Sequence, residues 1–333
     1  MAGERRRRPR HRRRHHRVAR ERGCACSPPR QRCRTAPPLY LGASGRGDPD
    51  DSRPRGAPAV TTLTIVIVSY NARADLEACL AALATLPPTT PHQIVVVDNA
   101  SSDGSAGVAR ARWPNVTVID AGDNLGFARA TNLGIRATAS ELLLLLNSDT
   151  LPSSGAIDRL VETLRSRTDV AVVGPRLVDS HGALEISFGS MMSPFAELWQ
   201  KCLVRGHARR VPLLAQLVEH RARTERRVDW VSGACLLVRR AEAEAAGLLD
   251  ERFFLYGEDV DFCATLRGLG RHVLYTPAVE VVHQRGRSQQ RAPAVAATAY
   301  RRSQLAFYRK HHPAWYPVLR VYLRVRGKLP PGE

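Results

Sequence analysis

Residues 141–150 read Glu-Leu-Leu-Leu-Leu-Leu-Asn-Ser-Asp-Thr, and this stretch decides the fold of the chain. A short apolar run bounded by polar residues predicts a strand that is buried on both faces, as in parallel sheets. The strand leads into a carboxylate, and ligands of open α/β sheets bind beyond the carboxyl ends of strands. Asp149 is therefore expected at the position where a metal-bound phosphate would bind. The alternative is a turn in which Asn147, Ser148 and Asp149 bond the backbone.

Strands and helices alternate around this run. The pattern predicts strands at Leu63–Ser69, Ile94–Val97, Val116–Ile119, Leu142–Leu146, Val170–Val173, Trp230–Arg239, His272–Tyr275 and Val279–Val282. Helices are predicted around Leu76–Leu83 and at Phe127–Thr138, Glu258–Leu269 and Ala294–Lys310. Residues 181–228 have no readable period. The alternation indicates an α/β fold, with a mainly parallel sheet flanked by helices on both faces.

The basic charge of the chain is concentrated at its beginning. Residues 1–60 hold 17 arginines and five acidic residues, and so carry +12 of the net charge of +19. This Arg- and Pro-rich segment is predicted to be a disordered tail, and it lacks the apolar core of a secretory signal. It could bind nucleic acid or acidic lipid through Arg5–Arg8, or be an extension without function. Nucleic acid is not expected as a partner of the folded body.

Cysteine usage and hydropathy indicate the compartment. The seven cysteines show no disulfide framework, which favours a reducing cytosol. No run approaches the roughly 20 apolar residues of a membrane-spanning helix. Residues 313–333 mix aromatic and aliphatic side chains with arginines, which is typical of a membrane-surface helix, although an ordinary docking helix has the same pattern. We expect a cytoplasmic protein with peripheral contact at the inner face of the cell membrane.

Polar residues follow the ends of four successive strands. They are Ser69-Tyr70-Asn71, Asp98-Asn99, Asp123–Ala128 and Asn147-Ser148-Asp149. Four such sites on one sheet edge describe a polar cleft for a nucleotide and a divalent cation. A carboxylate beside a ribose or base accepts hydrogen bonds, and one beside a diphosphate binds Mg²⁺ or Mn²⁺ through oxygen.

Two further clusters lie later in the chain. Glu258, Asp259 and Asp261 fall at a predicted helix N-terminus, where the helix dipole alone would favour acids. His283 leaves a strand and is followed by Arg285 and Arg287 in a glycine-containing loop that could close over phosphates. Taken alone, His283 would more commonly be structural.

These motifs resemble the inverting family-two glycosyltransferases. The resemblance is carried by Val66–Asn71, Val95–Gly104, Asn124–Ala128, Asn132–Gly134 and Leu146–Thr150, and Trp230–Cys235 and Phe253–Asp261 narrow it to a rhamnosyltransferase-like branch. It runs from about residue 63 to about residue 312. It implies a GT-A fold over 61–312, with a nucleotide-binding half (61–150) and an acceptor-binding half (151–312), between the tail and the basic aromatic segment 313–333.

The resemblance also implies a role for each site residue. Asp98 is similar to the aspartate that contacts the donor's base, and Asn71 and Asn99 line the nucleoside pocket. The remaining residues of the implied nucleotide-sugar site are Ser69, Asn124, Gly126, Asn147, Arg285 and Arg287. Asp149 and His283 match the implied metal ligands for Mg²⁺ or Mn²⁺. Many relatives have aspartate at the position of Asn147, a departure that predicts weaker metal dependence.

The implied reaction is a single in-line displacement. Asp259 matches the general base that takes the proton of the acceptor hydroxyl, and Glu258 is the neighbour that could replace it. The metal, Arg285 and Arg287 would neutralise the departing nucleoside diphosphate. A carboxylate is already ionised near neutral pH, so no large pKa shift is required. Asp261 would orient substrate or cap the helix.

The expected function is transfer of L-rhamnose from dTDP-rhamnose to a polyprenyl-diphosphate-linked glycan precursor of the cell envelope. One alternative is another donor sugar and an exopolysaccharide or O-antigen acceptor. A sugar-phosphate nucleotidyltransferase is not expected, because it would need a glycine-rich basic loop to bind a triphosphate, and Ser69-Tyr70-Asn71 stands at that position. The chain could also be a nucleic-acid or membrane binder that acts through the tail, or a catalytically inactive sugar-binding relative.

Overall fold

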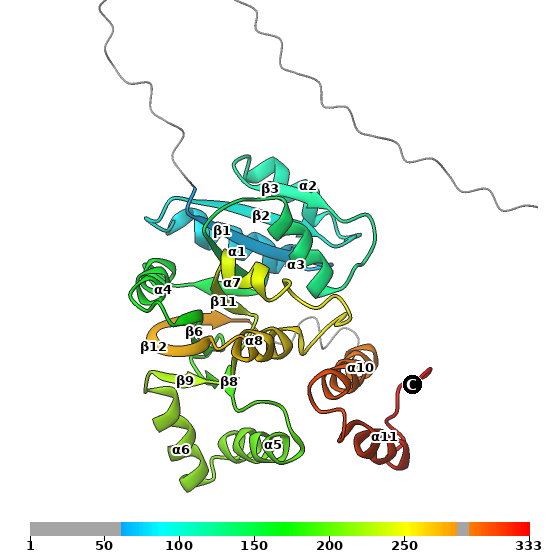
Figure 1. Ribbon diagram of the computed structural model, residues 1–333. Coiled ribbons are helices and arrows are strands. Elements are labelled where there is room, and N and C mark those ends of the chain that lie inside the picture. The colour runs from blue at the N-terminus through cyan, green and yellow to red at the C-terminus, as the bar shows by residue number, and fades with distance from the viewer. Residues whose placement is uncertain (1–60, 285–292) are drawn as a thin grey trace, which may run out of the picture. The chain divides into compact units, whose positions relative to one another are not determined.

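The leucine run forms β4 (Leu142–Asn147), a central strand of the sheet, in a computed structural model that describes residues 61–284 and 293–333 (Figure 1). The predicted tail 1–60, Arg285 and Arg287 lie outside the described residues. Leu142, Leu144 and Leu146 pack into one core cluster, and Leu143 and Leu145 pack into another. Both faces of β4 are therefore covered, as the apolar run predicts.

The first half of the sheet is parallel. Its strands are β1 (Leu63–Ser69), β2 (His92–Asp98), β3 (Thr117–Asp120) and β4, in the order β3-β2-β1-β4. β1 pairs in parallel with β2 and β4, and β2 pairs in parallel with β3. Their carboxyl ends therefore meet at one edge, which brings together the first polar sites along the chain.

The second half of the sheet is mixed rather than mainly parallel. Its strands are β5 (Thr150–Pro152), β6 (Val170–Val178), β7 (Leu184–Glu185), β9 (Arg226–Val228), β11 (Cys235–Arg239) and β12 (His272–His283). β11 is antiparallel to β4 and β6, whereas β12 is parallel to β6. A separate two-stranded sheet joins β8 (Phe188–Gly189) to β10 (Trp230–Val231).

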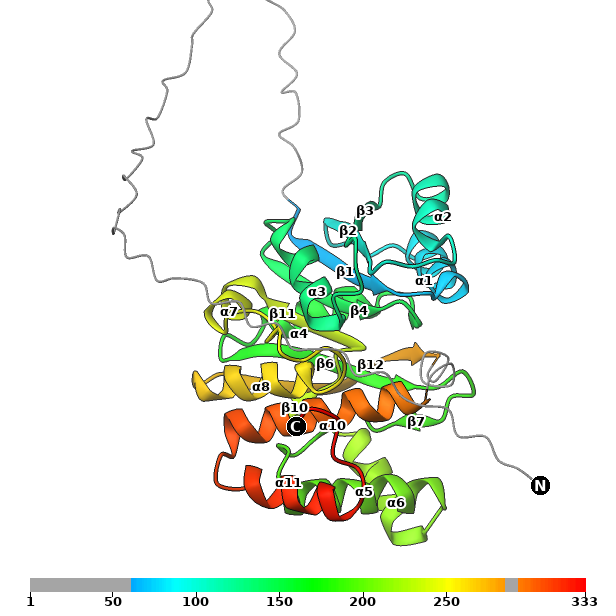
Figure 2. The same cartoon turned by 90° about the vertical axis from the view of Figure 1, so that its right-hand side faces the viewer.

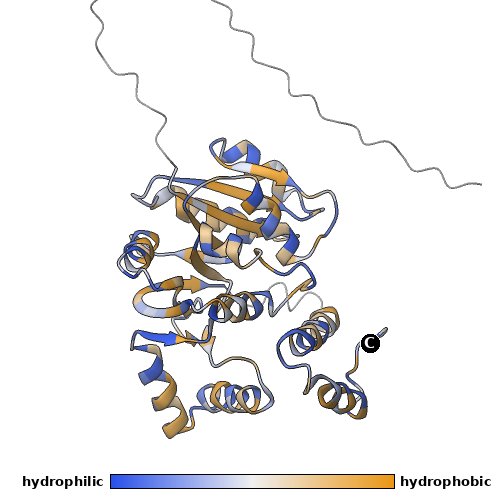
Figure 3. Ribbon diagram, viewed as in Figure 1, coloured by the Kyte–Doolittle hydropathy of each residue, from blue (hydrophilic) through white to orange (hydrophobic). Residues whose placement is uncertain are grey.

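Helices cover both faces of the sheet (Figure 2). Their bounds are α1 (Arg73–Thr85), α2 (Ser105–Arg112), α3 (Phe127–Arg136), α4 (Ala156–Arg165), α5 (Pro194–Ala208), α6 (Pro212–Ala222), α7 (Arg240–Ala245), α8 (Glu258–Gly268), α10 (Pro293–His311) and α11 (Tyr316–Val325). The first core cluster packs α1 and α4 against the sheet, and the second packs α3 and α8. Figure 3 shows the central strands in hydrophobic colours, consistent with burial between two helical layers.

Three local expectations are corrected. The two short strands predicted at 272–275 and 279–282 form one strand, β12, with a register shift between Thr276 and Glu280. The strand predicted at Trp230–Arg239 is divided into β10 and β11, and between them the Gly233 N–H donates to Asp259 instead of to a strand. Residues 181–228 contain β7, β8, α5, α6 and β9, which no simple period reveals. Within the described ranges, no helix is long and apolar enough to cross a membrane.

Candidate active site

The ends of β1 and β2 bring the first two polar sites side by side, because Ser69 pairs with Asp98 in the parallel register. Asp98 is 5% exposed, and its carboxylate accepts hydrogen bonds from the Ser101 backbone N–H (3.0 Å) and the Ser105 hydroxyl (3.2 Å). The turn after β2 therefore fixes this carboxylate in one orientation. Ser69 is fully buried, and its hydroxyl has no hydrogen-bond partner in the part of the chain that the structure describes.

Three asparagines join the loops that follow β1, β2 and β3. Asn71 adopts a φ of 49°, and its side-chain oxygen accepts from the Ser102 N–H at 2.8 Å. The Asn99 amide donates to the Asn124 oxygen at 2.9 Å, and its own oxygen accepts from the Leu125 N–H at 2.8 Å. These contacts join three separate loops into one hydrogen-bonded frame that holds the predicted nucleoside-binding residues.

Gly126 links this frame to the loop before α8. Its φ is +78°, and an added Cβ would lie 2.5 Å from the backbone oxygen of Phe254. The next residue, Phe127, donates its N–H to that same oxygen at 2.7 Å. Only glycine permits so close an approach, so the predicted donor and acceptor loops are in direct contact at this point.

Asp149 and His283 meet at the other end of the site. The Nε2 atom of His283 lies 3.2 Å from the Asp149 carboxylate, and its Nδ1 atom lies 2.8 Å from Glu185 Oε2. The strands explain the meeting, since His283 pairs with Thr150 in the β12–β5 ladder. Burial by itself lowers the pKa of His283, but the hydrogen bonds to the two carboxylates outweigh it and raise the pKa to about 9.

Glu185 is a residue that sequence reasoning missed. It lies on the two-residue strand β7, inside the segment 181–228, and it is 7% exposed. No local signal separates this acid from a surface glutamate, because its partner His283 is 98 residues away along the chain.

Asp149 and His283 are the candidate ligands for a divalent cation at this end of the site. No group of three His, Cys, Asp or Glu side chains is placed to hold a metal in residues 61–284 and 293–333. Asp149 and His283 nevertheless form a pair, and Glu185 holds Nδ1 of the ring so that Nε2 faces the carboxylate. This arrangement of an outer carboxylate behind a histidine is the usual support of a metal-binding imidazole. The pair fits a cation whose remaining ligands are diphosphate oxygens, with the cation taking the place of the Nε2 proton that now faces Asp149. Asn147 ends β4 two residues before Asp149, and its N–H donates to Ala234 O at 3.0 Å.

The predicted base lies at the start of α8. Asp259 accepts hydrogen bonds from the Gly233 N–H (2.9 Å) and the Val260 N–H (2.8 Å). Glu258 is 7% exposed, and its Oε2 atom has no hydrogen-bond partner among the residues described. Two left-handed residues, Tyr256 (φ 69°) and Gly257 (φ 82°), turn the chain into the helix. A tyrosine with positive φ is uncommon and indicates that the surroundings hold this turn in place.

Burial raises the pKa of both carboxyl groups in this pair. Burial raises the pKa of Glu258 to about 8, and the neighbouring charge of Asp259 contributes to the rise. Burial also raises the pKa of Asp259, although the N–H groups of Gly233 and Val260 favour its charged form. Two adjacent buried carboxyls do not both ionise readily, so Asp259 is favoured as the anion and Glu258 as the acid.

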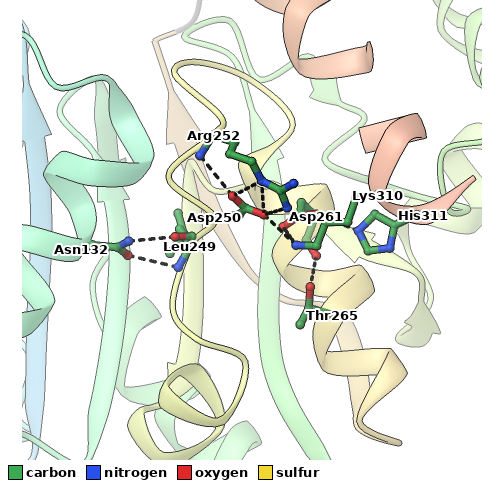
Figure 4. Close-up of polar contacts among 8 residues, drawn as sticks. All are labelled: Asn132, Leu249, Asp250, Arg252, Asp261, Thr265, Lys310 and His311. Atoms are coloured by element: carbon green, nitrogen blue, oxygen red, sulfur yellow. Dashed lines mark hydrogen bonds and ion pairs between the residues drawn. The ribbon is translucent and has the colours of Figure 1, made fainter. Parts of the chain in front are cut away.

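Asp261 is engaged by a neighbouring helix. It is 1% exposed, and its carboxylate is bonded to Lys310 Nζ (2.8 Å) and His311 Nε2 (2.7 Å) from α10. Lys310 also donates to Asp250 at 2.9 Å (Figure 4). This cluster fastens α10 to the helix that carries Glu258 and Asp259.

Comparison with known proteins places the fold and the family. The sequence model of the family described as "Glycosyltransferase like family 2" matches residues 58–317. The chain is 31% identical over 298 residues to the N-acetylglucosaminyl-diphospho-decaprenol L-rhamnosyltransferase of Mycobacterium tuberculosis, covering 80% of this chain and 94% of that protein. It is 27% identical to the low-salt glycan biosynthesis hexosyltransferase Agl10 of Haloferax volcanii, covering 69% of each chain.

Two solved structures are similar in fold. One is the mannosyltransferase PcManGT from Pyrobaculum calidifontis in complex with GDP-Man and Mn²⁺, with a TM-score of 0.52, 19% identity, and coverage of 80% of this chain and 72% of that one. The other is GalNAc-T7 with UDP, GalNAc and Mn²⁺, with a TM-score of 0.54, 16% identity, and coverage of 78% and 50%. Both are GT-A glycosyltransferases.

Proposed function

The chain belongs to glycosyltransferase family 2 and is a glycosyltransferase of the GT-A fold, and from this premise we propose that it transfers L-rhamnose from dTDP-L-rhamnose to a polyprenyl-diphosphate-linked glycan precursor of the cell envelope. The observation that supports this choice of sugar and acceptor most directly is the 31% identity to the decaprenol-linked rhamnosyltransferase, which spans almost all of that protein. A hexosyl donor and another glycan acceptor are the second candidate, favoured by the similarity to the Haloferax hexosyltransferase.

In this proposal the half 61–150 binds the donor. Asp98, fixed by Ser101 and Ser105, faces the base, and the linked amides of Asn71, Asn99 and Asn124 line the nucleoside pocket. Because these side chains already hold one another, binding requires little further ordering, which favours affinity. Gly126 closes the frame against Phe254 at the border with the half 151–312, which binds the acceptor.

The diphosphate end of the donor is assigned to Asp149 and His283. A divalent cation bound there, Mg²⁺ or Mn²⁺, would neutralise charge on the departing nucleoside diphosphate. The Mn²⁺ in both solved relatives is consistent with this assignment. Glu185 orients the imidazole, and Asn147 provides a neutral oxygen where many relatives have a carboxylate.

Asp259 is assigned as the general base. It removes the proton of the acceptor hydroxyl as the oxygen attacks the anomeric carbon from the face opposite the diphosphate, so the configuration inverts. The N–H groups of Gly233 and Val260 stabilise its charged form before the reaction. Burial raises the pKa of Glu258, which favours its neutral form and limits negative charge beside the base near neutral pH.

The test is nucleoside diphosphate release by the purified full chain with a panel of nucleotide sugars, polyprenyl-linked acceptors and Mg²⁺ or Mn²⁺. Release with dTDP-rhamnose that depends on the lipid-linked acceptor would support the proposal. Asp259→Asn should reduce turnover about 10²–10⁴-fold while nucleotide binding is retained. Asp169→Asn, an exposed change at the opposite edge of the sheet, serves as the control. Release with another donor alone would favour the second candidate.

A further inference from the structure

Helix α11 presents an apolar stripe to solvent. Val318, Val321, Tyr322 and Val325 are exposed, at the i, i+3, i+4, i+7 spacing that marks one face of a helix. The opposite face already packs inward, because Leu323 is fully buried and Leu319 packs against the cluster that contains Phe307 and Tyr308 of α10. An amphipathic helix normally buries its single apolar face, so this second stripe is not explained by folding of the described chain.

The hairpin of α5 and α6 has the same property. Phe195, Leu198 and Trp199 are exposed on α5, and Leu213 and Leu217 are exposed on α6. The exposed fractions reach 76% for Phe195 and 80% for Leu213, compared with 80% for Val325 on α11. The two helices are tightly joined, since Gly206 of α5 has no room for a Cβ against Leu214 of α6.

An aromatic contact joins α5 to the start of α11, and the three helices lie at one end of the folded unit. The rings of Phe195 and Trp315 meet edge to face with centroids 6.4 Å apart, which links the start of α5 to the residue before α11. Figures 1 and 2 both place α5, α6 and α11 at the same end of the folded unit. We call this surface the three-helix face. Exposed apolar patches of this extent on a folded domain usually mark an interaction site.

The charges around the three-helix face are basic. Arg320, Arg324, Arg326 and Lys328 are exposed on and after α11, and Lys201, Arg205, Arg209 and Arg210 are exposed on and after α5. The nearby acids are already engaged: Glu197 accepts from Tyr308 and Gln304 and pairs with Lys201, and Glu219 lies in ion pairs with His207 and Arg176. The face therefore combines exposed aromatic and aliphatic side chains with an excess of cations.

We propose that the three-helix face docks on an anionic lipid bilayer, with its apolar stripes in the interfacial region and its arginines and lysines at the headgroups. Aromatic and aliphatic side chains interleaved with cations are the composition that binds such interfaces. A second copy of the chain fits less well, because a twofold contact would place two basic faces against each other. The inference rests on the proposed function, since docking there brings a membrane-embedded acceptor to the enzyme.

The connection from this face to the predicted base is direct in the structure. α10, which packs against α11, donates from Ser303 Oγ to the backbone oxygen of Leu255 at 2.9 Å. Its last turn bonds Asp261 through Lys310 and His311. α10 thus lies between the docking helices and helix α8, which carries Glu258 and Asp259, so docking would hold the acceptor-binding half at the membrane surface.

The test is sedimentation of the full chain with phosphatidylcholine vesicles, with and without phosphatidylglycerol, at low and high salt. The paired variant Val321→Ser, Val325→Ser and a second pair, Phe195→Ser, Leu198→Ser, should each reduce partitioning onto anionic vesicles by roughly tenfold. The control pair Leu86→Ser, Leu269→Ser changes exposed leucines elsewhere and should bind as wild type. Circular dichroism verifies that every variant folds.

Three outcomes would overturn the proposal. One is unchanged partitioning of both surface pairs. A second is binding that high salt removes completely, which would assign the contact to charge alone, the Arg-rich segment 1–60 included. The third is a wild-type dimer in light scattering that the variants convert to monomers without any vesicle binding. Vesicle binding needs no sugar donor, so failure of the proposed reaction would leave this result readable by itself.

Discussion

The neighbouring carboxyl groups of Glu258 and Asp259 differ in their hydrogen bonds. Asp259 accepts two backbone N–H groups, whereas Glu258 Oε2 has no partner within the described residues. Burying a carboxylate without hydrogen-bond partners costs free energy, and this burial raises the pKa of Glu258 to about 8, which favours its protonated form near neutral pH. The surroundings of Asp259 favour its charged form, which suits a base, whereas those of Glu258 favour its neutral form.

This difference predicts how stability depends on pH. Glu258 has an ordinary pKa of 4.5 when unfolded and about 8 when folded, so the folded state binds the proton more tightly. Its contribution to stability is therefore complete below about pH 4.5 and is lost as the pH rises through about 8. Glu258→Gln should flatten the fall in unfolding free energy between pH 5 and 8, measured by urea denaturation. Glu162→Gln, an exposed change, should keep the wild-type slope.

Glu185 provides a second prediction for a single residue. Glu185→Gln keeps the shape of the side chain but removes the charge behind the His283 ring. We expect Mn²⁺ affinity in the presence of nucleoside diphosphate to weaken by about 10–100-fold, followed by electron paramagnetic resonance of free Mn²⁺. Turnover at saturating metal should change much less. Glu280→Gln, an exposed neighbour on β12, is the matched control, and equal losses in both variants would contradict the role assigned to Glu185.

Specific side-chain contacts between helices and loops hold the elements that carry the site residues in position. α10 fastens α8 through Lys310 and His311, and Asn132 of α3 holds Leu249 by two hydrogen bonds (Figure 4). The backbone at Gly126, just before α3, packs closely against the backbone of Phe254. The loop 249–257 is thereby positioned from several sides before α8 begins.

Replacing Lys310, which joins α10 to α8 through Asp261, should lower the stability of the protein. Lys310→Met leaves the buried Asp261 carboxylate paired with His311, and loss of one member of a buried pair costs on the order of 3 kcal/mol. We expect lower unfolding free energy in urea, together with reduced kcat. Arg309→Met alters the preceding cation, which faces Tyr316 and Glu333, and should have a far smaller effect on both quantities.

The contact at Gly126 can be tested with an internal control. Gly126→Ala and Gly122→Ala both place a Cβ at positive φ, 78° and 80°, but only the first meets backbone, at 2.5 Å, while the second meets open space. The Gly122 change should cost about 1 kcal/mol of unfolding free energy. The Gly126 change should cost several times more and reduce nucleotide affinity, measured by calorimetry. Equal costs would show that backbone strain alone matters here.

At the scale of the whole molecule, most of the net positive charge and the residues of the candidate active site lie in different parts of the chain. Residues 1–60 carry most of the net charge, whereas the family match and all the described site residues lie beyond residue 57. A transferase should therefore keep turnover when residues 1–54 are deleted, because the unit Arg55–Glu333 holds its own core. Assays of nucleoside diphosphate release would check this. Loss of turnover with retained folding would give the segment a role in the reaction.

Much of the fold and of the donor side could be predicted from local patterns. Alternating strands and helices identify the parallel half of the sheet, because each strand of that half is a separate apolar run with its polar end residues beside it. Asp98, Asn99 and Asp149 could be placed at one edge for the same reason. Residues 181–228 could not be read, since α5 and α6 expose apolar side chains and thus lack a clean amphipathic period.

The sequence by itself determined the α/β class, the four polar strand ends and the family resemblance, because these depend on residues near one another along the chain. The tertiary structure alone decided which distant groups meet: Glu185 behind His283, Lys310 and His311 on Asp261, and Phe195 against Trp315. It also decided that burial raises the pKa of Glu258. The physical reason is that burial and long-range pairing set pKa values, metal support and exposed surfaces, and neither can be seen in a linear pattern.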